Sequence, residues 1–258
     1  MYYILKNIIH ISISDFFNNH MKIKQIILLT LIFLLLSPFV LFAELTYNYN
    51  SGITKNPNAK DTIYITIDLC PSHHINYSKE LFESFIKLSQ SRGETIPIAI
   101  AISGVWLLNH KKSVSEILKI EKDGYIKITW VNHSYKHYYK TNLDNGKNFL
   151  LYNQSKTKED IKKNHDLMIK TGLTPSNFLR FPGLISNDYL DKLFENEGYK
   201  ILGASAWLNK TNGTFKGGDV ILVHGNRNEE IGVKLFIKNI INGSFNNYKF
   251  GSIEDFNK

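Results

Sequence analysis

The chain has 258 residues, of which 43% are hydrophobic, and its formal net charge is +8 at pH 7. This length and hydrophobic content suit one domain of barrel size with a sizeable core. The single cysteine, Cys70, excludes an intrachain disulfide. The lysines are scattered rather than clustered, so we predict no nucleic-acid partner.

Residues 1–43 predict a targeting segment. From Met21, two lysines precede an apolar run from Ile26 to Phe42 that ends at the small residue Ala43, which is the layout of a secretory signal peptide. An uncleaved membrane anchor is the alternative, since the run approaches the length that spans a bilayer. We therefore expect an exported protein of the periplasm or cell envelope, which contacts the membrane only if this segment is retained. Whether translation starts at Met21 is left open.

Residues 44–61 are polar, contain Gly and Pro, and are predicted to be a linker. Beyond them, β-like and helical patterns alternate. The expected strands are 62–68, 96–103, 125–133, 177–182, 199–205 and 219–225. The expected helices are 77–93, 113–124, 156–172, 186–198 and 229–241. This alternation predicts one α/β domain over residues 62–258, built on a parallel sheet or barrel, with an open doubly wound sheet as the alternative.

Polar side chains fall where these strands end. Asp68 ends the first strand and His133 the third. Arg180 lies in the short strand 177–182, and His224 ends the last strand. Such groups are costly in a core unless they are paired or bound to something. A barrel would gather them at the C-terminal ends of its strands, where chemistry is expected in this class of fold.

His133 and His137 are the candidate metal ligands. We expect Ser134 to cap a helical turn that brings both imidazoles to one ion. Imidazole suits zinc, cobalt and nickel, and an open site with water in the remaining positions suits catalysis. The alternative is two half-exposed histidines beside a tyrosine-rich loop. The polar residues at the other strand ends, Asp68, Arg180 and His224, favour the metal site over this alternative.

Arg180 and His224 have alternatives of their own. Arg180 lies between two apolar residues, so a buried guanidinium there needs a carboxylate, and Asp68 is the natural candidate. An ordinary surface charge is the other reading of Arg180. His224 shares a strand face with inward-pointing apolar residues, which is a good position for a general acid, although it could also bond to a neighbouring carbonyl.

These motifs resemble those of the polysaccharide deacetylase family, the carbohydrate esterases of family four with a nodulation-type (NodB-like) domain. Four segments match the family's motifs in order and spacing. The first, second, third and fifth motifs correspond to TIDLCP (66–71), HSYKH (133–137), RFPG (180–183) and LVH (222–224). The resemblance spans about residues 62–240. It implies an α/β fold, a distorted (β/α) barrel of about seven strands.

The resemblance also implies a function. The chain would be a metal-dependent hydrolase that removes acetyl from an N-acetylated amino sugar of peptidoglycan, another polysaccharide or a lipid-linked sugar. Separately, we expect the protein to be a monomer. His133 and His137 would bind the metal, with zinc favoured over cobalt or nickel. Asp68 would be the general base, Arg180 would orient it, and His224 would be the general acid.

The expected substrate contacts come from three places. Trp207 would line the acetyl pocket, and Pro182 and Gly183 follow Arg180, with the Gly183 N–H near the developing oxyanion. The segment 138–155 is rich in Tyr and Asn and follows the second histidine directly. We expect it to form a wall over the site where Tyr138 stacks on a sugar ring; a plain surface loop is the alternative.

Two motif residues depart from the family. The second Asp of the first motif, a metal ligand in the family, is Leu69 here. The missing ligand could be replaced by water, by Asp68, or by a side chain of His73, His74 or Cys70. Cys70 lies two residues after Asp68, so in extended chain it faces the same way, and a thiolate is a strong zinc ligand. A small buried side chain is the other role for Cys70.

The fourth motif retains Trp207 but lacks the Asp that tunes the acid histidine, so the partner of His224 is not identified. Together these departures leave two further hypotheses. One is a pseudoenzyme that binds glycan without cleaving it. The other is a different amide or ester hydrolase on the same scaffold.

Overall fold

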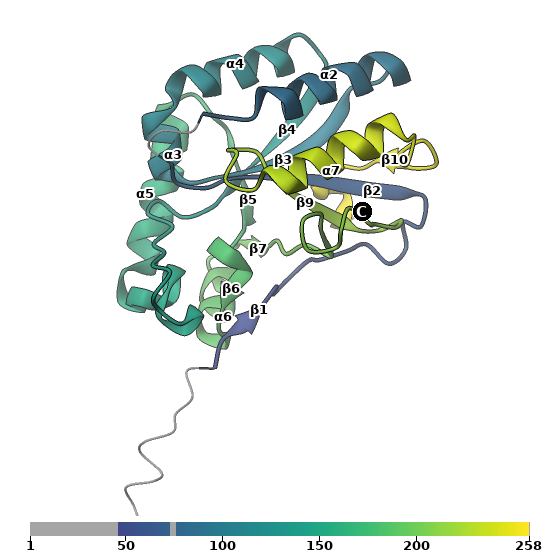
Figure 1. Cartoon of the computed structure of the whole chain (residues 1–258). Helices are drawn as coiled ribbons and strands as arrows, with labels where there is room; N and C mark the ends of the chain where they lie inside the picture. Colours follow the sequence, from purple (N-terminus) through teal and green to yellow (C-terminus); the bar gives the residue numbers. More distant parts are fainter. Residues whose placement is uncertain (1–45, 73–75, 258) are drawn as a thin grey trace, which may run out of the picture. The chain divides into compact units, whose positions relative to one another are not determined.

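The computed structural model describes residues 46–72 and 76–257 (Figure 1). The predicted targeting segment, residues 1–43, lies outside the described residues, as do His73 and His74. Within the part of the chain that is described, no helix combines the length and the apolar character that crossing a bilayer requires.

Parallel strands form a curled sheet. Around the barrel the strands follow chain order, namely β2 (Thr62–Leu69), β3 (Ile96–Ile102), β4 (Ile126–Asn132), β5 (Pro175–Leu179), β7 (Lys200–Ile201), β8 (Ala206–Trp207) and β9 (Val220–His224). β9 returns to pair with β2, and the pairings between these neighbouring strands are parallel. This circular order confirms the expected barrel of about seven strands and not the doubly wound sheet, in which the order would reverse.

The expected helices are all present. They are α2 (Lys79–Arg92), α4 (Lys111–Lys122), α5 (Thr157–Lys170), α6 (Asp188–Asn196) and α7 (Glu230–Ile241), and a short helix, α3 (Gly104–Asn109), was not predicted. Local signals set their ends. The Ser78 side chain accepts a hydrogen bond from the Leu81 N–H, and Gly93 ends α2 in the left-handed region at φ 67°.

Strand alternation separates two apolar layers. On β3, the four isoleucines pack in a core cluster shared with α2, α4 and α7, which lie together on the outer face of the sheet in Figure 1. Ala99 and Ala101 point to the opposite face, into the barrel. Small residues are needed there because the narrow interior also holds Arg180, which has no exposed surface.

The barrel has a seam between β7 and β8, and the N-terminal segment lies in it. The Ile53 N–H donates to Ile201 O (2.8 Å), and the Gly203 N–H donates to Ile53 O (2.9 Å). Upstream, β1 (Asn48–Tyr49) pairs with β6 (Ile185–Ser186). The described part of the predicted linker, residues 46–61, therefore runs along the barrel rather than away from it.

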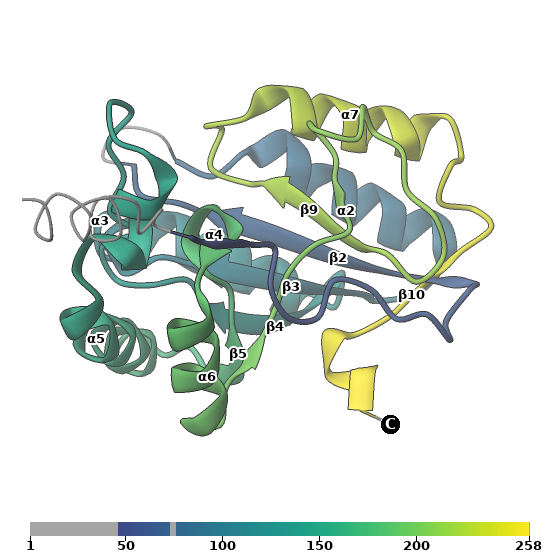
Figure 2. The same cartoon turned by 90° about the horizontal axis from the view of Figure 1, so that it is seen from below.

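The C-terminal segment covers the N-terminal end of the barrel. β10 (Lys249–Phe250) pairs with the start of β2, and the turn η4 (Ile253–Asn257) follows (Figure 2). The Phe256 ring lies 4.4 Å from the Tyr64 ring, measured between centroids. With this end covered, the cavity that holds the polar residues opens at the C-terminal ends of the strands.

Candidate metal and catalytic site

The polar strand ends meet in one cavity of about 750 Å³. Its lining includes four predicted site residues, Asp68, His133, His137 and His224. Arg180 lies behind them, fully buried, and its Nη1 donates to Asp68 Oδ1 at 2.7 Å. The other carboxylate oxygen of Asp68 is 3.6 Å from His133 Nε2. Four separate strands thus supply one constellation.

Cys70 joins the two histidines. One ligand atom from each of Cys70, His133 and His137 lies within 4.8 Å of the others. Strand β2 turns Asp68 and Cys70 toward the cavity, whereas the Leu69 side chain packs in the outer core cluster. The place that the family gives to a second carboxylate therefore does not face the site. The side chain of Cys70, two residues after Asp68, does face the site.

The donor set fits a metal ion. His137 Nε2 is buried, and among the described residues it has no hydrogen-bond partner. His133 Nδ1 lies 2.9 Å from the carbonyl oxygen of Arg180, which can only accept, so Nδ1–H donates and Nε2 is left to face Cys70 Sγ at 3.8 Å.

Electrostatics favour the ionised forms of both acids. Burial raises the pKa of Cys70, but His137, His224 and His133 around the sulfur lower that pKa well below its ordinary value. Burial alone would raise the pKa of Asp68. The Arg180 guanidinium and the nearby histidines have the larger effect, so the pKa of Asp68 is below its ordinary value. The thiolate is the form that binds a metal, and the carboxylate is the form that takes a proton.

The HSYKH segment is not helical, so the expected helical turn after His133 is wrong. Ser134 and His137 have positive φ values of 68° and 46°. The Ser134 hydroxyl still acts as a cap, because it accepts a hydrogen bond from the His137 N–H at 3.0 Å. The two imidazole rings lie 4.8 Å apart between centroids. The left-handed residues bring them together where one helical turn was expected.

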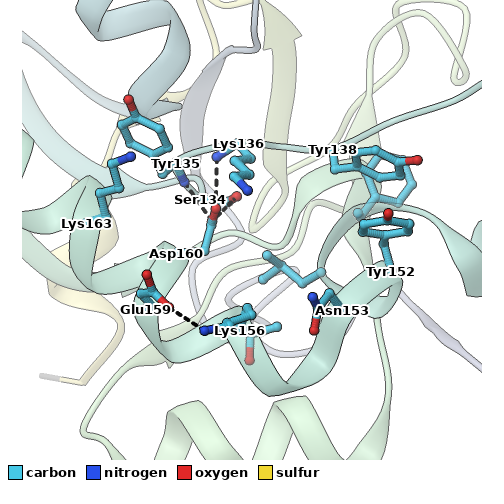
Figure 3. Close-up of a pocket in the computed structure, with 13 residues that line it drawn as sticks. Ser134, Tyr135, Lys136, Tyr138, Tyr152, Asn153, Lys156, Glu159, Asp160 and Lys163 are labelled. Atoms are coloured by element: carbon cyan, nitrogen blue, oxygen red, sulfur yellow. Dashed lines mark hydrogen bonds and ion pairs between the residues drawn. The ribbon is translucent and has the colours of Figure 1, made fainter.

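Asp160, in the first turn of α5, holds this loop from behind (Figure 3). Its carboxylate accepts from the Ser134 hydroxyl (2.5 Å), the Tyr135 N–H (2.8 Å) and the Lys136 N–H (3.0 Å). Sequence reasoning missed Asp160, because nothing local links a helix residue to a loop 24 residues upstream. Three donors to one carboxylate explain why two non-glycine residues stay in the left-handed region.

A second cavity, of about 530 Å³, lies on the Asp160 side of the loop. Tyr138 lines both cavities and stacks on Tyr152, with ring centroids 4.0 Å apart (Figure 3). The segment predicted as a wall, 138–155, contains the turns η1 (Asn145–Lys147) and η2 (Phe149–Lys156). Tyr138 therefore lies between the two cavities, and its contact with a sugar ring stays a prediction.

Gly183 lines the main cavity, in the turn η3 (Pro182–Leu184). Pro182 is buried at the start of that turn and is not among the residues that line the cavity. Gly183 has φ 63°, and a Cβ there would lie 2.4 Å from Phe149 Cζ. The aromatic ring that covers this turn therefore comes from η2, and it needs a residue without a side chain beneath it.

We expect Gly183→Ala to lower the free energy of unfolding by about 2–4 kcal/mol, because it combines left-handed backbone strain with a clash against the Phe149 ring. Urea denaturation measures this change. Gly93→Ala is the matched control, since Gly93 has a similar φ of 67° and nothing within 4 Å of the added Cβ. Equal losses in the two variants would show that the ring moves aside freely.

His224 and Trp207 lie on neighbouring strands, with ring centroids 5.3 Å apart. Glu229, which sequence reasoning missed, bonds to both. Its Oε2 accepts from Trp207 Nε1 (2.6 Å) and from His224 Nδ1 (3.1 Å), and its Oε1 accepts from Asn209 Nδ2 (2.7 Å). Burial lowers the pKa of His224, but Cys70, Glu229 and Asp68 raise it above its ordinary value.

Comparison with known proteins gives one family. The polysaccharide deacetylase family model matches residues 55–202, more than half of the chain. A family 4 carbohydrate esterase from Bacillus anthracis has a similar fold, with a TM-score of 0.56, 18% identity, and coverage of 82% of this chain and 96% of that chain. Bacillus subtilis PdaA, also a family 4 carbohydrate esterase, has a TM-score of 0.58 and 18% identity, with coverage of 81% of this chain and 85% of that chain.

A family 4 pseudoenzyme from Bacillus anthracis is similar too, with a TM-score of 0.54, 12% identity, and coverage of 77% of this chain and 66% of that chain. At these identities the solved structures establish the fold alone. The family model, together with the motifs on the strand ends, establishes more. The chain belongs to the polysaccharide deacetylase family, metal-dependent hydrolases that act on carbon–nitrogen bonds of N-acetylated glycans.

Proposed function

We propose that the protein is an exported deacetylase that hydrolyses the acetamide of an N-acetylated amino sugar in a cell-envelope glycan. Its metal is held by Cys70, His133 and His137. One observation carries the proposal: the ligand atoms of these residues lie within 4.8 Å of one another, in a cavity that Asp68 and His224 also line. Export rests on the signal-like segment 1–43 and is tested by cell fractionation.

The residues divide the chemistry between them. When bound, the metal polarises the acetyl carbonyl and makes a water molecule more acidic. Asp68, fixed by Arg180 at 2.7 Å, takes the proton from the attacking water. His224 gives a proton to the departing amine. The Gly183 N–H is proposed to stabilise the negative charge on the acetyl oxygen, and Trp207 to pack against the acetyl group.

Zinc is the proposed metal, since a thiolate with two imidazoles is a set typical of zinc. Zinc content of the purified protein and acetate release test the proposal together. Acetate is measured with N-acetylglucosamine oligomers, peptidoglycan and a lipid-linked N-acetylated sugar, which separates the three substrate sources. Metal bound together with acetate release supports the proposal.

A glycan-binding pseudoenzyme is the second candidate, favoured by Leu69 at a ligand position of the family and by a similar fold among pseudoenzymes. It predicts glycan binding with no acetate from any of these substrates. A catalytic protein needs Asp68 and His224 at the metal site, whereas a binding protein does not. Acetate release therefore decides between the two candidates.

We expect His133→Ala to lose bound zinc and to lower acetate release at least about 100-fold, because the variant removes one of three ligands and leaves the ion weakly held. Zinc per chain is measured by mass spectrometry beside the activity. His165→Ala is the control, since His165 is half-exposed on α5 and away from the main cavity. A folded His133→Ala protein with full zinc content would reject the ligand assignment.

A further inference from the structure

Glu229 lies at the start of α7, where a side chain would ordinarily cap the helix. Among the described residues, however, its carboxylate makes no hydrogen bond to the first turn of α7. It turns instead toward the strands and is used by three side-chain donors, on Trp207, Asn209 and His224. A helix-capping role therefore does not explain this residue.

The contact with His224 fixes the proton on one ring nitrogen. A carboxylate can only accept, so His224 Nδ1 carries the hydrogen in the 3.1 Å contact with Glu229 Oε2. Nε2 is then the nitrogen left for the cavity, which His224 lines. An outer carboxylate that sets the orientation and protonation site of an active histidine is a general device of enzymes.

The same oxygen, Oε2, also accepts from Trp207 Nε1 at 2.6 Å. Trp207 lines the cavity from the strand next to His224. Glu229 Oε2 therefore links the ring of His224, the proposed proton donor, to the ring of Trp207, the proposed wall of the substrate pocket. Asn209 holds the other oxygen at 2.7 Å and keeps the carboxylate from rotating away.

We propose that Glu229 is a positioning residue that holds His224 with Nε2 toward the substrate and holds Trp207 in the cavity wall. The proposal deepens the deacetylase function and rests on it for the catalytic readout. It supplies the partner of His224 from the segment after β9, whereas the fourth motif, before β9, has no acid in this chain. The two positions lie on opposite sides of His224 in the sequence.

Two variants separate orientation from simple removal of a side chain. Glu229→Leu removes all three acceptor contacts. Glu229→Gln keeps a carbonyl oxygen for Trp207 and His224, and the Asn209 amide can turn to accept from the new amide group. Glu230→Gln is the matched control, because Glu230 is exposed and bonds to Arg227 on the surface.

The first readout does not need activity. In nuclear magnetic resonance of the ¹⁵N-histidine-labelled protein, the Nδ1–H proton of His224 should be observed as a hydrogen-bonded signal in the parent protein and in Glu229→Gln. It should be lost in Glu229→Leu by exchange with water. Retention of the signal in Glu229→Leu would overturn the proposal, even if the protein released no acetate from any glycan.

The second readout is kinetic and applies once acetate release has been measured for the parent protein. Glu229→Leu should lower kcat by about 10–100-fold through His224 and raise KM through Trp207, with zinc content unchanged. Glu229→Gln should recover most of the lost kcat, and Glu230→Gln should match the parent. Equal losses in Glu229→Gln and Glu229→Leu, or no loss in Glu229→Leu, would overturn the positioning role.

Discussion

Replacing Leu69 with aspartate is expected to lower the free energy of unfolding by at least about 4 kcal/mol, and not to complete the metal site. Alignment of the first motif alone would suggest the opposite, because the family has a metal-binding Asp at this place. Leu69, however, is fully buried in the outer core cluster, where its Cδ2 would lie 3.2 Å from a Cβ placed on Gly225. A carboxylate there would be buried among the apolar side chains of this cluster.

Urea denaturation, with the midpoint and slope compared between variants, measures the loss. Leu69→Ala is the control, because it removes the same contacts without adding a charge and should cost about 2–5 kcal/mol. The difference between the two variants is the cost of burying the carboxylate. If Leu69→Asp were as stable as the parent and bound zinc more tightly, the end of β2 would have to rotate, and the assignment of Cys70 as a ligand would fall.

The parts of the fold that local patterns control were predictable. Apolar runs and helical spacing placed the strands and helices, and the period of two along β2 predicted that Cys70 faces the same side as Asp68. The rule that parallel strands carry chemistry at their C-terminal ends predicted that Asp68, His133 and His224 would meet. Each of these inferences needs only neighbouring residues or the fold class.

The remaining features depend on contacts between distant segments. Asp160 and Glu229 lie in a helix turn and a loop, and nothing in their sequence surroundings distinguishes them from solvated acids. The left-handed conformation of His137 is stable only because other groups hold the loop, whereas propensity favoured a helical turn. The segment 46–61 has the composition of a linker, and its backbone pairing with the barrel seam follows from the gap between β7 and β8.

Asp68→Asn is expected to lower acetate release by about 100- to 10,000-fold while zinc content stays unchanged. Asp68 Oδ1 is bound to Arg180 and its other oxygen lies 3.6 Å from His133 Nε2, so an amide would fill the same space without accepting a proton. The variant should also lose about 3–5 kcal/mol of stability, since Arg180 is fully buried and would lose the carboxylate of Asp68 that pairs with its charge.

Arg180 keeps other acceptors in this variant, namely Thr66 Oγ1 and Gly203 O, both at 2.8 Å. The domain should therefore still fold at low temperature, and circular dichroism recorded at the assay temperature separates lost chemistry from lost structure. Asp61→Asn is the control, because Asp61 is an exposed acid paired with Lys249 and should leave acetate release unchanged. If folded Asp68→Asn kept more than about a tenth of the activity, the base would be another group. If it lost zinc instead, Asp68 would be a ligand, and the three-ligand site built on Cys70 would need to be revised.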